Sequence, residues 1–159
     1  MAVAQLHLRR YQTFTIGSHT IYLEQVIALF RIVGPQIPAI LLEGVVDTGA
    51  PMTVFPQKEW QLFQQEIQWL TALNDPAVPR WCRQFSGVSG GTFSSRLGLI
   101  TVEFFDAIGG RVGPAEIMAT FAHDNGRMRD ILVGLSGGTF TKRRLELVYD
   151  DQNISLSDV

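Results

Sequence analysis

The sequence predicts one mainly β domain, closed into a barrel or stacked as a sandwich. Apolar stretches rich in Val, Ile, Leu, Phe and Tyr recur along the chain, Gly- and Pro-containing turns separate them, and only one segment has helical spacing. The chain has 159 residues, 46% hydrophobic and 18% charged, which suits a single domain with a sizeable core. We expect that core within about residues 20–150 and a loose polar tail at 150–159.

The first third of the chain is predicted to be all strand. Residues 3–16 alternate loosely between apolar and polar side chains and end at a Gly-Ser turn. Residues 19–33 form one long strand or two, and a Gly-Pro pair breaks the run. Residues 39–47 form the next strand, so that Asp47 lies at the end of a hairpin's second strand, in an Asp-Thr-Gly turn.

After Pro56 the apolar side chains recur three and four residues apart. They are Trp60, Phe63, Ile67, Leu70 and Leu73, with Gln and Glu covering much of the remaining surface. This spacing predicts one amphipathic α-helix over residues 57–73. The apolar stripe is interpreted as core packing.

The second half of the chain returns to strands. Phe85 and Phe93 flank a Gly-rich tip, which predicts a β-hairpin, and because a strand follows, a phosphate-binding loop is rejected. Further strands are expected at residues 97–105 and 115–122, at a buried stretch that stops at Gly134, and at 145–149.

Composition excludes several classes of partner. The net charge of −2 leaves no electrostatic footprint for nucleic acid or for an anionic membrane. The most apolar stretch, residues 26–46, contains Arg31, two prolines and Glu43, and does not resemble a membrane span. The single Cys82 indicates a reducing compartment, and no signal pattern begins the sequence, so we expect a soluble, cytoplasmic protein.

The histidines do not indicate a catalytic dyad or a metal site. His7, His19 and His123 are scattered, none pairs recognisably with a Ser or with Cys82, and no metal-ligand spacing occurs. We therefore expect no metal and no cofactor. Paired carboxylates remain: two Asp side chains that share a proton can activate a water and polarise a substrate carbonyl.

Asp47 is the candidate for that chemistry. A carboxylate at the end of a buried strand costs desolvation energy, which indicates a partner or a function. The alternative is a turn Asp that caps neighbouring backbone. Because the chain has one Asp-Thr-Gly, a pair requires a twofold homodimer, in which Asp47 faces its symmetry mate.

The segment Val45-Val46-Asp47-Thr48-Gly49-Ala50, followed by Thr53-Val54-Phe55, resembles the active-site segment of the retropepsin-like aspartic proteases, the family of the retroviral proteases and their cellular relatives. Ile131-Leu132-Val133-Gly134 resembles the second family signature. The Gly-rich hairpin is similar in position to the flap that closes over bound peptide. The resemblance covers roughly residues 26–149.

The resemblance implies a closed, barrel-like retropepsin (acid protease) fold with a flap hairpin, to which the predicted helix would be an addition. It implies an obligate homodimer that hydrolyses peptide bonds through a water activated by Asp47 of each subunit. Thr48, Gly49 and Ala50 would support the active-site turn, and Val133 and Gly134 would pack beneath it. The flap residues that would contact a peptide or protein substrate are Ser86, Gly87, Val88, Ser89, Gly90 and Gly91.

Two positions depart from the family pattern. Pro51 stands where a polar residue is usual, and Leu135 stands where a charged one is common. We infer that a Pro51–Leu135 contact replaces an ion pair. These departures keep a second function open: a catalytically weak or inactive retropepsin-like dimer that holds a partner peptide.

Overall fold

The computed structural model describes residues 3–35, 40–47, 49–86, 91–134, 143–148 and 153–158. Most of the described chain is β-strand, as the sequence predicted. The strands are β1 (Val3–Ile16), β2 (His19–Ile32), β3 (Ile40–Val46), β4 (Thr53–Phe55), β5 (Gln68–Trp69), β6 (Gln84–Ser86), β7 (Thr92–Phe105), β8 (Arg111–His123), β9 (Ile131–Val133), β10 (Arg143–Val148) and β11 (Asn153–Asp158). The helical elements are α1 (Gln57–Trp60), the 3₁₀-helix η1 (Gln61–Glu66) and α2 (Arg80–Arg83). None of these helices is long and apolar enough to cross a bilayer.

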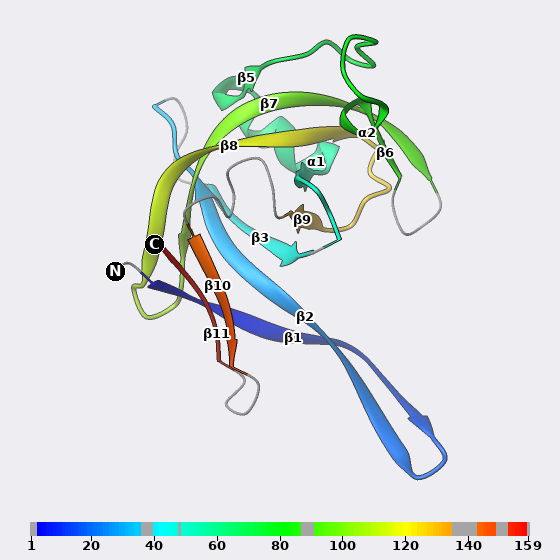
Figure 1. The fold of residues 1–159 in the computed structure, drawn as a ribbon, viewed down its shortest axis with the longest axis vertical. Coiled ribbons are helices and arrows are strands. Elements are labelled where there is room, and N and C mark those ends of the chain that lie inside the picture. The colour runs from blue at the N-terminus through cyan, green and yellow to red at the C-terminus, as the bar shows by residue number, and fades with distance from the viewer. Residues whose placement is uncertain are drawn as a thin grey trace.

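The strands form a continuous sheet that curves back on itself (Figure 1). The order is β10-β11-β1-β2-β3-β9-β4-β8-β7-β5, and β6 pairs with β7. Because β2 also pairs with β7, from Leu29 opposite Phe105 to Ile32 opposite Val102, the strands β2, β3, β9, β4, β8 and β7 close a ring.

Aromatic side chains fill the core of this ring. Phe55 of β4 stacks on Phe121 of β8 with ring centroids 5.4 Å apart, and it meets Phe30 of β2 edge-on at 6.0 Å. Phe104 of β7 packs on Phe30 at 5.7 Å, and all four rings are buried. Such contacts add to the burial of large apolar surfaces. Phe55 therefore fixes β4, and with it the chain that leaves Asp47, against β2 and β8.

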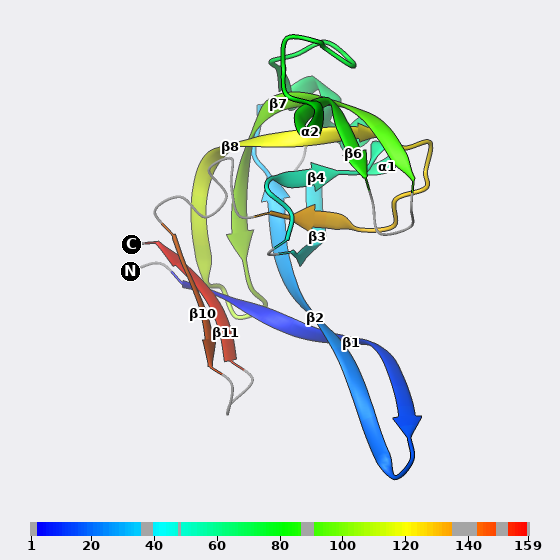
Figure 2. The same cartoon turned by 45° about the vertical axis from the view of Figure 1, so that its right-hand side comes forward.

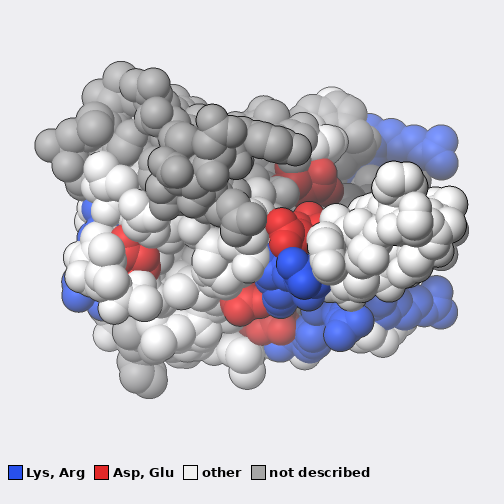
Figure 3. Space-filling model, turned by 90° about the horizontal axis from the view of Figure 1, so that it is seen from below, with Lys and Arg blue, Asp and Glu red and all other residues white. Residues whose placement is uncertain are grey.

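The β1–β2 hairpin extends away from the ring as an arm (Figures 1 and 2). β1 pairs with β11 only over Val3–Leu6, and β2 pairs with β3 and β7 only over Ile27–Ile32. We define the arm as residues 11–23, where the described strands pair only with each other. Seen from below in Figure 3, its surface is white, and charged side chains gather at its base. These include the ion pairs Arg9–Glu43, Arg9–Asp130 and Arg10–Glu24.

The predicted helix over residues 57–73 is wrong. One helical turn, α1, passes into the 3₁₀-helix η1, and the chain becomes extended at Ile67 (φ −86°, ψ 119°). It then forms β5, where Gln68 pairs with Leu99 of β7. Trp69 packs edge-on against the ring of Phe121 at 5.2 Å, while the Arg96 guanidinium lies 3.9 Å from the Trp69 ring centroid. Backbone pairing to β7 and these ring contacts therefore replace the last turns of the expected helix.

The expected loose tail is also wrong. Residues 153–158 form β11, which pairs antiparallel with both β10 and β1. Leu156 lies opposite Ala4 and is buried in the main core. Pairing with two neighbouring strands and the burial of Leu156 thus order a segment whose polar composition predicts a loose tail.

The other predicted strands form with shifted bounds. The strand expected at 97–105 begins earlier, at Thr92, and the one expected at 115–122 runs from Arg111 to His123. The strand expected at 145–149 is β10, and the buried stretch that stops at Gly134 is β9. Longer strands on the β7–β8 pair supply backbone partners for β4, β5 and β6.

Candidate functional site

Asp47 lies at the ends of two parallel strands. β3 and β9 pair from Gly44 opposite Ile131 to Val46 opposite Val133, and the Asp47 amide N donates to the Val133 carbonyl O at 3.1 Å. β4 pairs with the other side of β9 in the antiparallel sense. The chain therefore leaves β3, crosses the end of β9 and returns as β4 (Figure 2), so that Asp47 opens the crossing turn.

Two hydrogen bonds hold the turn at Asp47, and one of them orients the carboxylate. The Gly49 amide N donates to Asp47 Oδ1 at 2.9 Å, and the Ala50 amide N donates to the Asp47 carbonyl O at 3.2 Å. This geometry matches the turn-capping interpretation of Asp47 and is compatible with a reactive carboxylate. The side chain is half-buried, and among the described residues no donor reaches Oδ2.

The crossing turn rests directly on Gly134. A Cβ at position 134 would lie 2.3 Å from the carbonyl C of Met52 and 2.8 Å from the carbonyl O of Ala50, far inside van der Waals contact. The Gly134 amide N donates to Thr53 Oγ1 at 3.3 Å, and Thr53 and Val133 are buried. Only glycine leaves room for the backbone to cross here, so the structure brings Asp47, Ala50, Val133 and Gly134 together.

Two residues that position this turn were missed by sequence reasoning. Gly44 lies inside β3, and a Cβ there would come within 2.7 Å of Val133 Cγ2. Thr53 supplies the hydroxyl beneath Gly134. A glycine inside a strand is a signal of close packing, so Gly44 could have been identified; Thr53 belongs to the segment that carries the family resemblance, but its hydrogen bond to Gly134 was not predicted.

The expected flap is described only at its base. β6 and β7 pair from Gln84 opposite Ser94 to Ser86 opposite Thr92, which confirms the hairpin. Ser86 ends β6, and Gly91 precedes β7, where a Cβ would lie 3.0 Å from the Phe93 ring. Residues 87–90 lie outside the described part of the chain, as do Thr48 and Leu135. The roles inferred for them, including the Pro51–Leu135 contact, remain predictions.

Among the described basic residues, His123 at the end of β8 has a pKa that is shifted from its ordinary value. Burial, followed by the nearby Arg96 charge, lowers the pKa of His123, while the Asp124 carboxylate opposes the shift. Its ring lies 5.1 Å from the Trp60 ring, and the buried Nε2 has no hydrogen-bond partner among the described atoms. Among these residues, no three His, Cys, Asp or Glu side chains gather in a metal-binding group.

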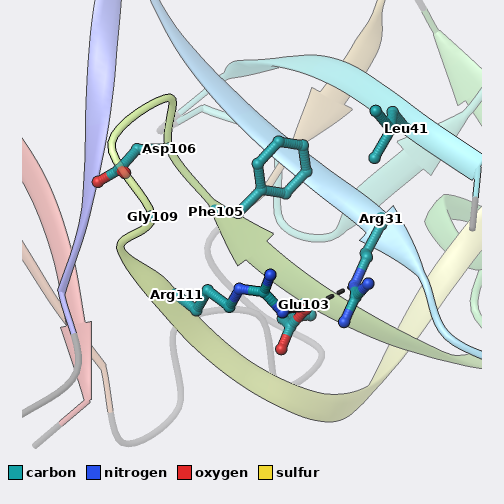
Figure 4. A pocket seen from close by; sticks show the side chains of 7 residues that line it. All are labelled: Arg31, Leu41, Glu103, Phe105, Asp106, Gly109 and Arg111. Atoms are coloured by element: carbon teal, nitrogen blue, oxygen red, sulfur yellow. Dashed lines mark hydrogen bonds and ion pairs between the residues drawn. The ribbon is translucent and has the colours of Figure 1, made fainter.

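A separate pocket of about 230 Å³ lies between β2, β3 and the β7–β8 turn (Figure 4). Glu103, only 7% exposed, accepts from Arg31 Nε at 2.5 Å, and one of the Arg111 terminal nitrogens lies 3.8 Å away. Leu41 and Phe105 supply the apolar wall. The two guanidiniums are directed at Glu103, so this pocket is organised around its own ion pairs.

Comparison with known proteins leaves this geometry to be interpreted by itself. No protein-family model matches the chain, and a search of curated proteins finds no match. The resemblance to retropepsin-like proteases rests on the residues of the two motifs and on their order.

Proposed function

We propose that the chain is an aspartic endopeptidase with a retropepsin-like fold, active as a homodimer with one Asp47 from each subunit. One observation carries the proposal. The Asp-Thr-Gly turn crosses over Gly134 at the end of β9, so two motifs 87 positions apart in the sequence form one structural unit around a carboxylate. A turn that only connects two strands would need neither the buried Gly134 nor the parallel β3–β9 pairing beneath it.

The chemistry follows from placing two such carboxylates together. Two Asp side chains about 3 Å apart cannot both ionise, so the pair holds one proton. The ionised carboxylate takes a proton from a water, whose oxygen attacks the peptide carbonyl carbon, while the protonated carboxyl donates to the carbonyl oxygen. Collapse of the tetrahedral intermediate then breaks the C–N bond: the amine leaves with a proton from the pair, and a hydroxyl of the intermediate returns one, so that the products are a carboxylic acid and an amine and the pair again holds one proton.

Substrate binding in this proposal uses backbone pairing. The β6–β7 hairpin offers a strand edge beside which an extended peptide can form main-chain hydrogen bonds. Side-chain pockets along such a peptide would then set preference. A folded substrate would have to present a cleavable segment in an extended, accessible conformation.

The test is peptide-library hydrolysis between about pH 3 and pH 8, the range in which carboxylate pairs titrate. Asp47→Asn keeps the side-chain oxygen that accepts from Gly49 but removes the titratable carboxylate. We expect cleavage to fall about a hundredfold or more, which is the usual effect of losing an acid–base group.

Asp75→Asn is the matched control. Asp75 Oδ1 accepts from the Ala77 amide N at 2.9 Å, the same local cap at the same distance as Asp47 and Gly49, but on a separate loop. Equal activity of the two variants would reduce Asp47 to a turn cap and reject the proposal. A wild-type dimer that binds library peptides and cleaves none at any pH would instead support the peptide-binding module.

A further inference from the structure

The arm has two faces of different chemistry. Cross-strand partners are Phe14 with Ile21 and Ile16 with His19 on one side, and Thr13 with Tyr22 and Thr15 with Thr20 on the other. Because side chains alternate along a strand, one side carries Phe14, Ile16, Ile21 and Leu23, with Gln12 opposite Leu23 and His19 opposite Ile16 at its two ends. We call this the apolar face; Ile16 on it is 61% exposed.

The arm also lacks formal charge. Residues 11–23 contain no Lys, Arg, Asp or Glu. Charged residues flank the arm on both sides in the sequence: Arg10 of β1 precedes it and Glu24 of β2 follows it. Arg10 Nη2 lies 3.5 Å from Glu24 Oε1, and the Arg10 guanidinium lies 3.8 Å from the centroid of the Tyr22 ring, so the charges stop at the base. An isolated two-stranded hairpin is marginally stable in water, and exposed strand edges are usually protected by charge. The absence of charge therefore suits a surface that another uncharged surface covers.

The arm begins beside the candidate catalytic turn. Ile27 of β2 lies opposite Val45 of β3, and Asp47 follows Val45 by two residues. The base of the arm and Asp47 thus share one edge of the ring. A twofold axis that passes beside Asp47, as the proposed function requires, brings the bases of two arms together.

The size of the apolar face limits what it can do. Five paired residues on each strand give a face about 17 Å long and about 10 Å wide, so two such faces bury roughly 350 Å². A stable interface buries about 1,600 Å². Contact between arms is therefore too small to hold two chains alone and must add to a second contact near Asp47.

We infer that the apolar face of the arm packs against the same face of the arm of a second copy of this chain. The occupant is a second copy because the face is uncharged and self-complementary, its base adjoins Asp47, and its area needs a companion contact that the paired Asp47 turns provide. This inference rests on the proposed homodimer, and it adds the surface that stabilises it.

The test places charge at the centre of the apolar face. Phe14→Lys and Phe14→Glu each put like charges on two facing arms, so each variant should dissociate to monomers with a dimer dissociation constant raised at least tenfold in sedimentation velocity. An equimolar mixture of the two places opposite charges on facing arms, and the mixed dimer should be at least tenfold tighter than either variant alone.

Thr15→Lys and Thr15→Glu are the controls, because Thr15 is exposed on the opposite face one residue away. These variants should dimerise as the wild type does. The inference is overturned if the Phe14 variants dimerise as the wild type does, or if their mixed dimer is no tighter than the dimer of each variant alone. It is also overturned if the wild-type chain is monomeric. A monomer that binds neutral lipid vesicles through its arm would assign the apolar face to a membrane instead. Repeating the Phe14 and Thr15 series in the Asp47→Asn background separates the two proposals. Assembly measured in that background tests the arm without depending on cleavage, whereas the loss of cleavage in Asp47→Asn itself tests the proposed function.

Discussion

At the scale of single residues, the candidate site depends on the absence of a side chain at Gly134 as much as on the presence of one at Asp47. The crossing backbone from Ala50 to Met52 fills the space where a Cβ would stand. Gly49, immediately before this segment, donates the hydrogen bond that orients the Asp47 carboxylate, and the Ala50 amide N donates to the Asp47 carbonyl O. Packing at Gly134 and chemistry at Asp47 are therefore coupled through a few atoms of backbone.

Gly134→Ala should destabilise the protein and impair the site together. The added Cβ meets backbone atoms of Met52 at 2.3–2.4 Å, which cannot move without displacing the turn, so we expect a loss of about 1–3 kcal/mol or more in the free energy of unfolding. Gly34→Ala is the control, because the three atoms nearest to its Cβ belong to the Glu66 side chain, which can turn aside where backbone cannot. Urea unfolding of both variants measures the difference, and equal costs would contradict the close crossing.

Asp106 gives the protein an acid-sensitive link. Its carboxylate accepts from the amide N of Gln5 on β1, and of Ile108 and Gly110 in the β7–β8 turn, at 2.7–3.0 Å. These hydrogen bonds hold the pKa of Asp106 below its usual range, and the bond from the Gln5 amide has the largest effect. These bonds favour the charged form, so the link stabilises the fold above the unfolded-state pKa near 4 and is lost as the pH falls through the lower folded-state value.

Asp106→Asn should therefore cost stability at neutral pH and change the acid limb. An Asn side chain must direct its NH₂ group toward one of these backbone donors, so we expect a loss of about 1–3 kcal/mol at pH 7. The difference between the variant and the wild type should shrink as the pH falls below about 4. Thermal or urea unfolding at several pH values measures it; a constant difference down to pH 2 would assign the effect to packing instead.

At the scale of elements, residues 57–69 show what hydrophobic spacing can and cannot specify. The spacing identified Trp60, Phe63 and Ile67 as buried, and all three are in the core. It could not distinguish a continuous helix from a helical turn, a 3₁₀-helix and a strand, because each can bury residues three and four apart. The deciding partner, the free edge of β7 at Gly98 and Leu99, is about 30 residues away in the sequence.

Substitutions along this stripe should separate the two structures. Ile67 is 6% exposed and packs against Gly98, so Ile67→Ala should cost about 2–5 kcal/mol. Leu73 is 45% exposed, and Leu73→Ala should cost no more than about 0.5 kcal/mol. A continuous amphipathic helix would bury both residues, so similar costs in urea unfolding would contradict the observed break after Glu66.

The same distinction explains which parts of the site were predictable. The turn at Asp47 and the stop at Gly134 are local patterns, and the family resemblance implied that the two pack together. The closure of the ring through β2 and β7, and the support from Gly44 and Thr53, depend on which strands meet across the molecule. A single sequence indicates local conformational preference clearly, but it indicates only weakly which strands will pair. β11 and the segment 57–69 were mispredicted for that reason.

At the scale of the whole molecule, the two ends of the described chain are structurally joined. β1 lies between β11 and β2, so the strand that begins the fold connects the terminal hairpin to the ring. Leu156 of β11 is packed in the same core as Phe30 and Val133. The ring, the terminal strands and the base of the arm therefore form one core, and the proposed dimer would join two complete units rather than two halves of one core.

The proposed symmetry makes a quantitative prediction about mixed subunits. If each active site needs an Asp47 from both chains, random exchange of equal amounts of wild type and Asp47→Asn leaves about a quarter of the dimers with two intact carboxylates. Mixed dimers hold one carboxylate and cannot form the proton-sharing pair. Total cleavage by a fixed amount of total protein should therefore fall to about a quarter of the wild-type value, whereas a site complete within one chain would retain about half. The Phe14 variants extend the argument, because a subunit that dimerises more weakly inhibits its partner less: Asp47→Asn combined with Phe14→Lys should inhibit added wild-type chains less than Asp47→Asn alone does. Inhibition by that double variant equal to inhibition by Asp47→Asn alone would show that the arm does not contribute to assembly.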